Sequence, residues 1–312
     1  MKDSALEKWE YKEHTRVKHI LLRKYLKVWI TALGKYNPRI CYFDGFAGRG
    51  EYIEGTLGSP LLALKLADEL SGYFEELICY FVEKDTDNFD NLTEVLEREK
   101  PNIKNWQKKI IVKKENDEFA KVIGKIFKEM REGYIIIPSF FFIDPFGFSG
   151  VPFQIITRIL LNPRTEIFFT FMERDIARFL QLPELEDIFN SLFGTSKLKD
   201  MVLSLKGQKR EVALINLYRK QLHEVANVKY SWPFKVCTSE KVQTLYYLLH
   251  VTNSYIGHKK MKEIMANQSV QGNFAYLGPQ DITMRFQMRL FDANSIEELK
   301  EYLLKRFVGR RI

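Results

Sequence analysis

A glycine-rich turn, Asp44-Gly45-Phe46-Ala47-Gly48-Arg49-Gly50, follows the apolar run 39–43. Glycines lack a Cβ and let backbone N–H groups come close to a ligand, so this turn is a candidate cofactor site. Its glycines follow the order GxxGxG, whereas a dinucleotide fingerprint is GxGxxG opening directly into a helix. A nucleotide-dependent oxidoreductase is therefore disfavoured. The sequence also has no GxxxxGK[ST] segment, which disfavours P-loop nucleotide hydrolysis.

Acidic residues follow two later strand-like runs. Glu83 closes the run 77–82, and a carboxylate at such a strand end can accept hydrogen bonds from both hydroxyls of a ribose. Glu83 follows Asp44 by more residues along the chain than the ~20 that usually separate the glycine turn from the ribose-binding acidic residue in a dinucleotide fold. We predict Glu83 as the ribose ligand, the alternative being a solvated turn. Asn116 and Asp117 are placed to reach an adenine amino group, although Asx residues also cap helices.

A second turn, Asp144-Pro145-Phe146-Gly147-Phe148, directly follows the apolar run 140–143. An ionisable side chain at the tip of so apolar a strand is costly unless it is paired or functional. Asp144 is therefore the candidate catalytic residue. The alternative is a helix-capping turn with buried phenylalanines. The ring of Phe146 or Phe148 could stack on a flat substrate.

The first turn resembles motif I of class I methyltransferases, which reads Asp-Pro-Phe-x-Gly-x-Gly in enzymes that methylate amino groups of nucleobases. Gly45 replaces the proline here. The resemblance implies that S-adenosylmethionine is the cofactor. Gly48 and Gly50 would lie close to its aminoacyl part, Phe46 would line the same site, and Asp44 would fix the loop or receive the ammonium group.

The second turn resembles motif IV, the Asp-Pro-Pro-aromatic segment of amino-methyltransferases, and more closely the Asp-Pro-Phe-Gly of some tRNA guanine methyltransferases. The resemblance implies a catalytic segment of Asp144, Pro145, Phe146 and Gly147. Asp144 and the Pro145 carbonyl would hold the target amine, whose lone pair attacks the sulfonium methyl group in line.

Taken together, the motifs resemble the three-Cys-motif partner protein family, most firmly over residues 14 to 170. Membership implies a methyltransferase-like protein that acts with a neighbouring three-cysteine protein. We expect methyl transfer to an amino group, with RNA or DNA as the first candidate substrate. A non-catalytic adaptor subunit that keeps the cofactor fold is the alternative. The residues that carry the resemblance are Asp44 to Gly50, Gly58-Ser59-Pro60, Glu83, Asp144 to Gly147, Thr252-Asn253 and Lys260 to Met265.

The elements that must position these residues alternate along the chain. A helical spacing of apolar residues from Val17 to Ala32 predicts a long first helix, and Ser59 and Pro60 predict the N-cap and first residue of the next. Strands alternating with helices predict a Rossmann-like α/β fold, with a mainly parallel sheet and helices on both faces. The runs 234–238 and 244–252 predict an antiparallel pair at the sheet edge. The four strand-like runs after the first are 77–82, 110–112, 140–143 and 166–171.

This pattern predicts five segments. Residues 1–38 form an N-terminal helical segment, and 39–172 form the α/β core that binds S-adenosylmethionine. Residues 173–208 form a helical insertion, 209–271 complete the sheet, and 272–312 form a C-terminal extension with a helix at 295–307.

Composition excludes some classes of protein. No apolar run approaches the ~20 residues of a membrane-spanning helix, and the charged N-terminus lacks the pattern of a secretory signal, so we expect a cytoplasmic protein without membrane contact. Cys41, Cys79 and Cys237 are widely spaced in apolar runs, which predicts buried thiols and no metal. A net charge of +8 is compatible with a nucleic-acid partner.

Overall fold

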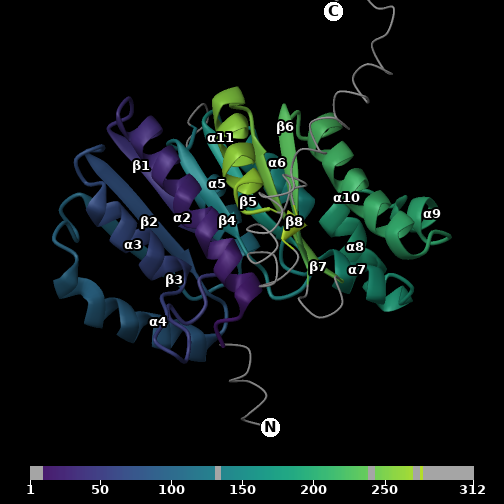
Figure 1. Cartoon of the computed structure of the whole chain (residues 1–312), viewed down its shortest axis with the longest axis horizontal. Helices are drawn as coiled ribbons and strands as arrows, with labels where there is room; N and C mark the ends of the chain where they lie inside the picture. The colour runs from purple at the N-terminus through teal and green to yellow at the C-terminus, as the bar shows by residue number, and fades with distance from the viewer. Residues whose placement is uncertain (1–9, 131–134, 238–242, 270–274, 277–312) are drawn as a thin grey trace, which may run out of the picture.

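The computed structural model describes residues 10–130, 135–237, 243–269 and 275–276, and the statements below concern these residues. An eight-stranded sheet in the order β3-β2-β1-β4-β5-β7-β6-β8 forms its centre (Figure 1). Strands β1 to β5 are parallel, and β7 is antiparallel to both of its neighbours. The strands are β1 Arg39–Asp44, β2 Glu76–Val82, β3 Ile110–Glu115, β4 Ser139–Ile143, β5 Thr165–Phe171, β6 Tyr230–Cys237, β7 Thr244–Thr252 and β8 Ala275–Tyr276.

The order of the first seven strands, with β7 inserted antiparallel between β5 and β6, is that of the Rossmann-like class I methyltransferase fold. This confirms the predicted fold class. The predicted antiparallel pair also forms, but β6 is not the outermost strand, because β8 pairs with it in parallel. In such sheets, ligands bind beyond the carboxyl ends of the parallel strands.

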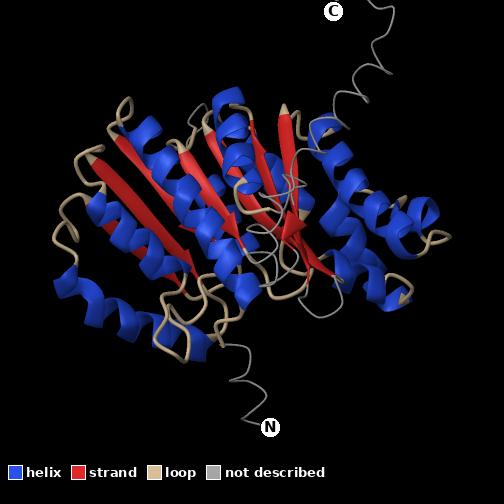
Figure 2. Ribbon diagram, in the orientation of Figure 1, coloured by secondary structure: helices blue, strands red, loops and turns tan. Residues whose placement is uncertain are grey.

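Helices cover both faces of the sheet (Figure 2). One face packs against α2 Glu13–Gly34, α3 Ser59–Glu69, α4 Thr86–Glu99 and α11 Tyr255–Ala266. The other face packs against α5 Phe119–Glu129, α6 Phe153–Leu160, α7 Glu173–Phe179, α8 Glu186–Phe193, α9 Leu198–Val202 and α10 Gly207–Glu224. Two 3-10 turns, η2 Lys100–Asn102 and η3 Pro183–Leu185, complete the described elements.

The strands divide their aromatic side chains between the two faces. Phe140 and Phe142 pack into the core beneath α2, whereas Phe141 packs into the core beneath α5 and α6. Successive residues of a strand point to opposite faces, so a continuous apolar run serves both cores. Each buried phenylalanine contributes about 1.5–3 kcal/mol relative to an exposed one. The uninterrupted run 140–143 is therefore suited to a central strand.

A buried cluster of polar side chains attaches α2 to strands β5 and β7. The Tyr25 hydroxyl of α2 donates to the carboxylate of Glu166 in β5, and Nε2 of His250 in β7 lies 2.9 Å from the same carboxylate. His250 is fully buried. Loss of one partner would leave a buried polar or charged group unpaired, which is strongly destabilising. This cluster therefore holds α2, which carries site residues at its N-terminal end, in a fixed place.

One predicted helix start is wrong. Gly58 is the N-cap of α3, Ser59 is its first residue and Pro60 its second. The Ser59 hydroxyl does not cap the helix but hydrogen bonds to the fully buried carboxylate of Asp44, which would otherwise lack this donor. The helix predicted at 295–307 lies outside the described residues.

The three cysteines are buried and free, as predicted. Burial raises the pKa of the Cys41 thiol to about 12 and that of Cys79 well above its usual value. They therefore act as small core side chains. None of the helices within the described residues combines the length and apolar character that crossing a bilayer requires.

Candidate cofactor and catalytic site

Three acidic residues stand at the carboxyl ends of three neighbouring strands. Asp44 ends the central strand β1, and it pairs in register with Phe81 of β2 on one side and Phe142 of β4 on the other. Glu83 and Asp144 each follow two residues later on those flanking strands. The parallel register therefore brings the three carboxylates to one edge of the sheet, although 100 residues of chain separate the first from the last.

Asp44 is fully buried and bonded to its own turn. Its carboxylate accepts hydrogen bonds from the Tyr42 hydroxyl at 3.1 Å, from the Phe46 N–H at 3.4 Å and from Ser59. Burial raises the pKa of Asp44 to about 7, although these donors lower it. Of the two roles that the sequence suggests for Asp44, these contacts support the fixing of the loop.

Glu83 holds the glycine turn in place. Its Oε2 accepts a hydrogen bond from Gly48 N–H at 2.9 Å, and its Oε1 accepts one from Asp85 N–H at 2.8 Å. Glu83 is only 7% exposed, and burial raises its pKa. Each carboxylate oxygen has a second lone pair, so two acceptor positions remain for ribose hydroxyls. Glu83 itself is buried, whereas Lys84 and Asp85 beside it are exposed, so its role as the ribose ligand stays a prediction.

The turn depends on glycine at two positions. Gly48 has φ +63° and Gly50 has φ +83°, in the left-handed region that other residues rarely adopt. A Cβ on Gly50 would lie 2.9 Å from Cδ1 of Leu92 in α4. A Cβ on Gly58 would lie 2.7 Å from the Gly50 carbonyl oxygen, to which the Gly58 N–H donates. The turn is therefore a close-packed cradle with backbone amides along it.

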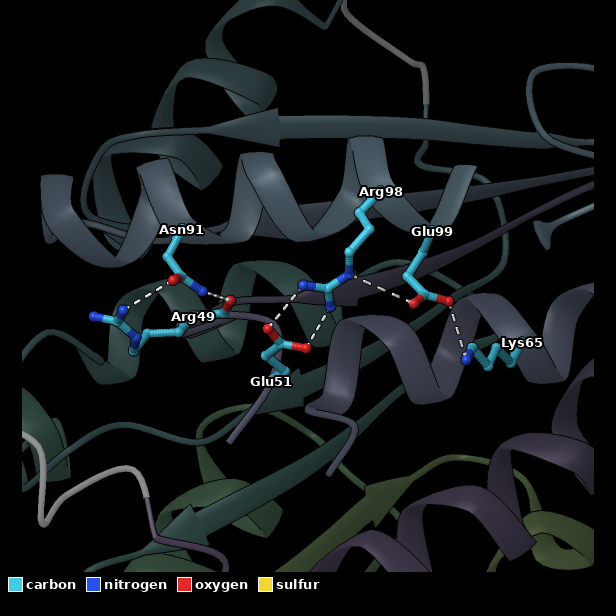
Figure 3. A network of polar contacts seen from close by, with 6 residues as sticks. All are labelled: Arg49, Glu51, Lys65, Asn91, Arg98 and Glu99. Atoms are coloured by element: carbon cyan, nitrogen blue, oxygen red, sulfur yellow. Dashed lines mark hydrogen bonds and ion pairs between the residues drawn. The ribbon is translucent and has the colours of Figure 1, made fainter. Parts of the chain in front are cut away.

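Polar contacts join the end of this turn to α4 (Figure 3). The Asn91 side chain accepts a bond from the Arg49 guanidinium and donates to the Arg49 carbonyl, both at 2.8 Å. Glu51 forms a two-point ion pair with Arg98. Arg98 is more than half exposed, so this ion pair contributes about 1 kcal/mol or less. The contacts fix the direction in which the chain leaves the turn.

The residues after β3 are placed beside this region. Asn116 donates to the carbonyl of Glu83 at 2.9 Å and thus ties the ends of β2 and β3 together. Asp117 accepts the N–H of Glu118 at 2.7 Å, and about half of its side chain is exposed. The N-cap position of α5 belongs to Glu118. A contact of Asp117 with adenine stays a prediction.

Asp144 is not a free carboxylate. Its Oδ2 forms an ion pair with the ammonium group of Lys18, which projects from α2 and is only 8% exposed. The Lys18 ammonium also lies 5.6 Å from the ring centroid of Tyr246 in β7. Sequence reasoning missed Lys18, because 126 positions separate it from Asp144.

Aromatic rings surround this ion pair. Tyr11, His19 and Tyr52 form a cluster with ring centroids 5.0–5.8 Å apart. Burial and the charge of Lys18 lower the pKa of His19 to about 3 and that of His14 to about 4. Both imidazoles are therefore neutral at neutral pH. The ion pair therefore has uncharged rings beside it, and the Asp44 carboxyl is close enough to interact with Asp144.

The rest of the Asp144 turn separates into buried and exposed parts. Pro145 is buried, Gly147 has φ +100°, and the Phe146 side chain is 67% exposed. The Phe148 ring packs against Phe179 and Phe189, with centroids at 6.0 and 4.8 Å. Of the two rings that the sequence offers for stacking on a substrate, only Phe146 is exposed.

The raised pKa of Asp44 predicts how stability depends on pH. The native state keeps this proton up to about pH 7, whereas the unfolded chain releases it near 3.8. Its contribution is therefore complete below the unfolded pKa and is lost as the pH rises from about 4 to about 7. Three pKa units set an upper bound of roughly 4 kcal/mol.

Urea denaturation of the wild type and Asp44→Asn across this window measures the effect. We expect the wild type to lose stability relative to the variant as the pH rises. A difference between the two proteins that is constant with pH would contradict the assignment.

Comparisons with known proteins add structural neighbours. No protein-family model matches the chain, and neither does any curated protein. An O-methyltransferase from Bacillus cereus, solved with SAH, shares 13% identity over 80% of this chain and 86% of its own, with a TM-score of 0.40. Trm1 from Pyrococcus horikoshii, solved with S-adenosyl-L-methionine, shares 10% over 81% of this chain and 59% of its own, with a TM-score of 0.38. An rRNA methylase from Streptococcus thermophilus shares 9% sequence identity with this chain. The match covers 73% of this chain and 93% of the methylase, with a TM-score of 0.32.

Proposed function

We propose that this protein is an S-adenosylmethionine-dependent methyltransferase that acts on an amino group of a nucleic-acid base. The observation that carries the proposal is the meeting of Asp44, Glu83 and Asp144 at the carboxyl ends of adjacent strands, with Gly48 bonded to Glu83. The strand order supports the same class of enzyme.

The acceptors and glycines of the site support S-adenosylmethionine as the cofactor. Glu83 would accept the ribose hydroxyls with its two remaining lone-pair positions, and the cradle of Gly48 and Gly50 would take the aminoacyl part. Phe46 packs on the Phe119 ring at 5.7 Å and would line the same side. When bound, the sulfonium group supplies an activated methyl, so no metal is needed for the transfer.

The chain's own residues would position the acceptor. Lys18 occupies Oδ2 of Asp144, which leaves Oδ1 to accept an N–H of the target amine, and the Pro145 carbonyl would accept the other. The transfer would form a nitrogen–carbon bond as the carbon–sulfur bond of the cofactor breaks, leaving the cofactor as a neutral thioether, and the methylated amine would release its proton to solvent. Oriented acceptors stabilise the positive charge that develops on the nitrogen. The ion pair with Lys18 would orient the Asp144 carboxylate.

A cofactor-binding adaptor is the second candidate. The observation that favours it is the Lys18–Asp144 ion pair, because it neutralises the carboxylate on which catalysis would depend. For either candidate, the proposal that the protein acts with a three-cysteine-motif partner rests on the resemblance of the sequence motifs.

Labelled methyl transfer tests the proposal. We expect purified protein with labelled S-adenosylmethionine to label total RNA or DNA but not protein, with the three-cysteine partner absent or present. Calorimetry on the same sample measures cofactor binding. If the protein binds the cofactor but labels nothing with or without the partner, the adaptor becomes the favoured function. If it does not bind the cofactor even at millimolar concentration, both the methyltransferase and the adaptor proposals are wrong.

A further inference from the structure

A second cleft opens at the carboxyl end of the sheet, on the face opposite Lys18. It has a volume of about 1030 Å³ and lies between α7, the start of α10 and the ends of β6 and β7. This volume is at the upper end of the ~300–1,000 Å³ of ligand pockets, so the cleft has room for a segment of polymer. The charged residues that line it are Glu173, Arg174, Arg178, Arg210, Glu211 and Lys235.

The three arginines of the cleft form no ion pair with a described residue, although the Arg210 charge interacts with Glu173. Arg174 and Arg178 lie one turn apart on α7, and neither forms an ion pair with a described residue. The Arg210 guanidinium donates to the carbonyls of Leu203 and Leu205 at 3.0 and 2.6 Å. It is thus held in place but not neutralised. Guanidinium groups match the geometry of phosphate oxygens, so these side chains suit a phosphate backbone.

The first turn of α10 adds to the positive potential. Gly207 and Gln208 line the cleft, and the helix has no side-chain N-cap and no acidic residue in its first turn. The N–H groups at the start of an uncapped helix attract anions. They supplement the arginines on the same wall.

One carboxylate in the cleft lacks a donor. Glu173 is 5% exposed and makes no hydrogen bond or ion pair with any part of the chain that the structure describes. By contrast, Glu211 accepts from Thr244 and Tyr247 and pairs with Lys235 at 2.8 Å. Burial, together with the charge of Glu211, raises the pKa of Glu173 to about 7. Glu173 lines the cleft, so its lone pairs are available to an N–H group of a ligand.

We propose that this cleft binds a nucleotide of an unpaired nucleic-acid strand, with its phosphates on Arg174 and Arg178 and its base donating an exocyclic amino N–H to Glu173. Adenine, cytosine and guanine carry such a group, whereas uracil and thymine do not. An unpaired strand exposes this edge of the base. The inference rests on the proposed function, because the strand would be the methyl acceptor, but binding itself requires no cofactor.

Fluorescence anisotropy with labelled homopolymers of about twelve nucleotides tests the proposal on the full-length protein. We expect Arg174→Ala/Arg178→Ala to weaken binding at least tenfold. The salt-dependence slope should also fall by about 1.4, because each phosphate of a single strand that an arginine neutralises adds ~0.7 to it. The matched control, Arg23→Ala/Arg39→Ala, removes the same charge from exposed arginines that pair with Glu69 and Glu76. It should change the affinity by less than about twofold.

Glu173→Met tests the contact with the base, because methionine has a similar length but no carboxylate oxygen to accept the amino N–H. The wild type should prefer adenine, cytosine or guanine homopolymers over uracil or thymine, and the variant should lose that preference. RNA and DNA series run in parallel show which strand is bound.

The proposal is overturned if the wild type binds no homopolymer, or if the arginine variant binds like its control. An unchanged base preference in Glu173→Met would overturn the contact with the base. Calorimetry with S-adenosylmethionine on the same proteins separates this failure from failure of the proposed function, because cofactor binding should be the same in all of them.

Discussion

Asp144→Asn should reduce methyl transfer by about 10²–10³-fold while cofactor affinity stays within a few-fold of the wild type. In the proposed function the Asp144 carboxylate would face the acceptor amine, and removal of an interaction made mainly in the transition state costs rate rather than binding. Single-turnover transfer and calorimetric titration measure the two quantities. The amide keeps the shape of the side chain but loses its negative charge.

A second variant separates this effect from destabilisation. Asp144→Asn leaves the buried ammonium of Lys18 without its ion-pair partner, and such a loss costs up to about 3–5 kcal/mol. Lys18→Met with Asp144→Asn removes both charges and should recover most of the stability while remaining inactive. Full activity in the double variant would show that Asp144 has a structural role only.

Glu83→Gln should weaken S-adenosylmethionine binding at least tenfold. The side-chain amide has one acceptor oxygen in place of two, so the N–H of Gly48, the N–H of Asp85 or a ribose hydroxyl loses its acceptor. A hydrogen bond to a charged group contributes about 1.5–3 kcal/mol, which corresponds to tenfold or more in affinity. Isothermal calorimetry provides the dissociation constants.

Glu115→Gln is the matched control. Glu115 ends the neighbouring strand β3, and its carboxylate accepts from the Tyr80 hydroxyl at 3.2 Å. It is not part of the proposed cofactor site, so its substitution should leave the affinity unchanged. Equal losses in the two variants would show that the end of β2 has no special part in binding.

The sequence was sufficient to predict the sheet and the three carboxylates at its edge. Apolar runs report burial on both faces, and a polar residue directly after such a run must lie at the strand end. In parallel strands these ends lie on one edge, so Asp44, Glu83 and Asp144 could be grouped without coordinates. The alternation of strand-like and helical segments along the chain predicted the parallel sheet with helices on both faces.

The partners of these carboxylates could not be predicted. Lys18 lies in a helix between Val17 and Leu21, and nothing in that helix identifies the residue that its ammonium pairs with. Ser59 resembles a helix cap, because the sequence does not show that the Asp44 carboxylate lies beside it. Such contacts join residues far apart in the chain and depend on rotamers, which periodicity does not report.

Two neighbouring tyrosines of β7 contact different regions, one beside the Lys18 ion pair and one in the arginine-lined cleft. The Tyr246 hydroxyl donates to the His14 carbonyl beside the Lys18 ion pair, and the Tyr247 hydroxyl donates to Glu211 in the arginine-lined cleft. One strand thus forms the wall between the two regions. Because β7 is paired along its length with β5 on one side and β6 on the other, the sheet itself sets the spacing between the Lys18 ion pair and the arginine-lined cleft.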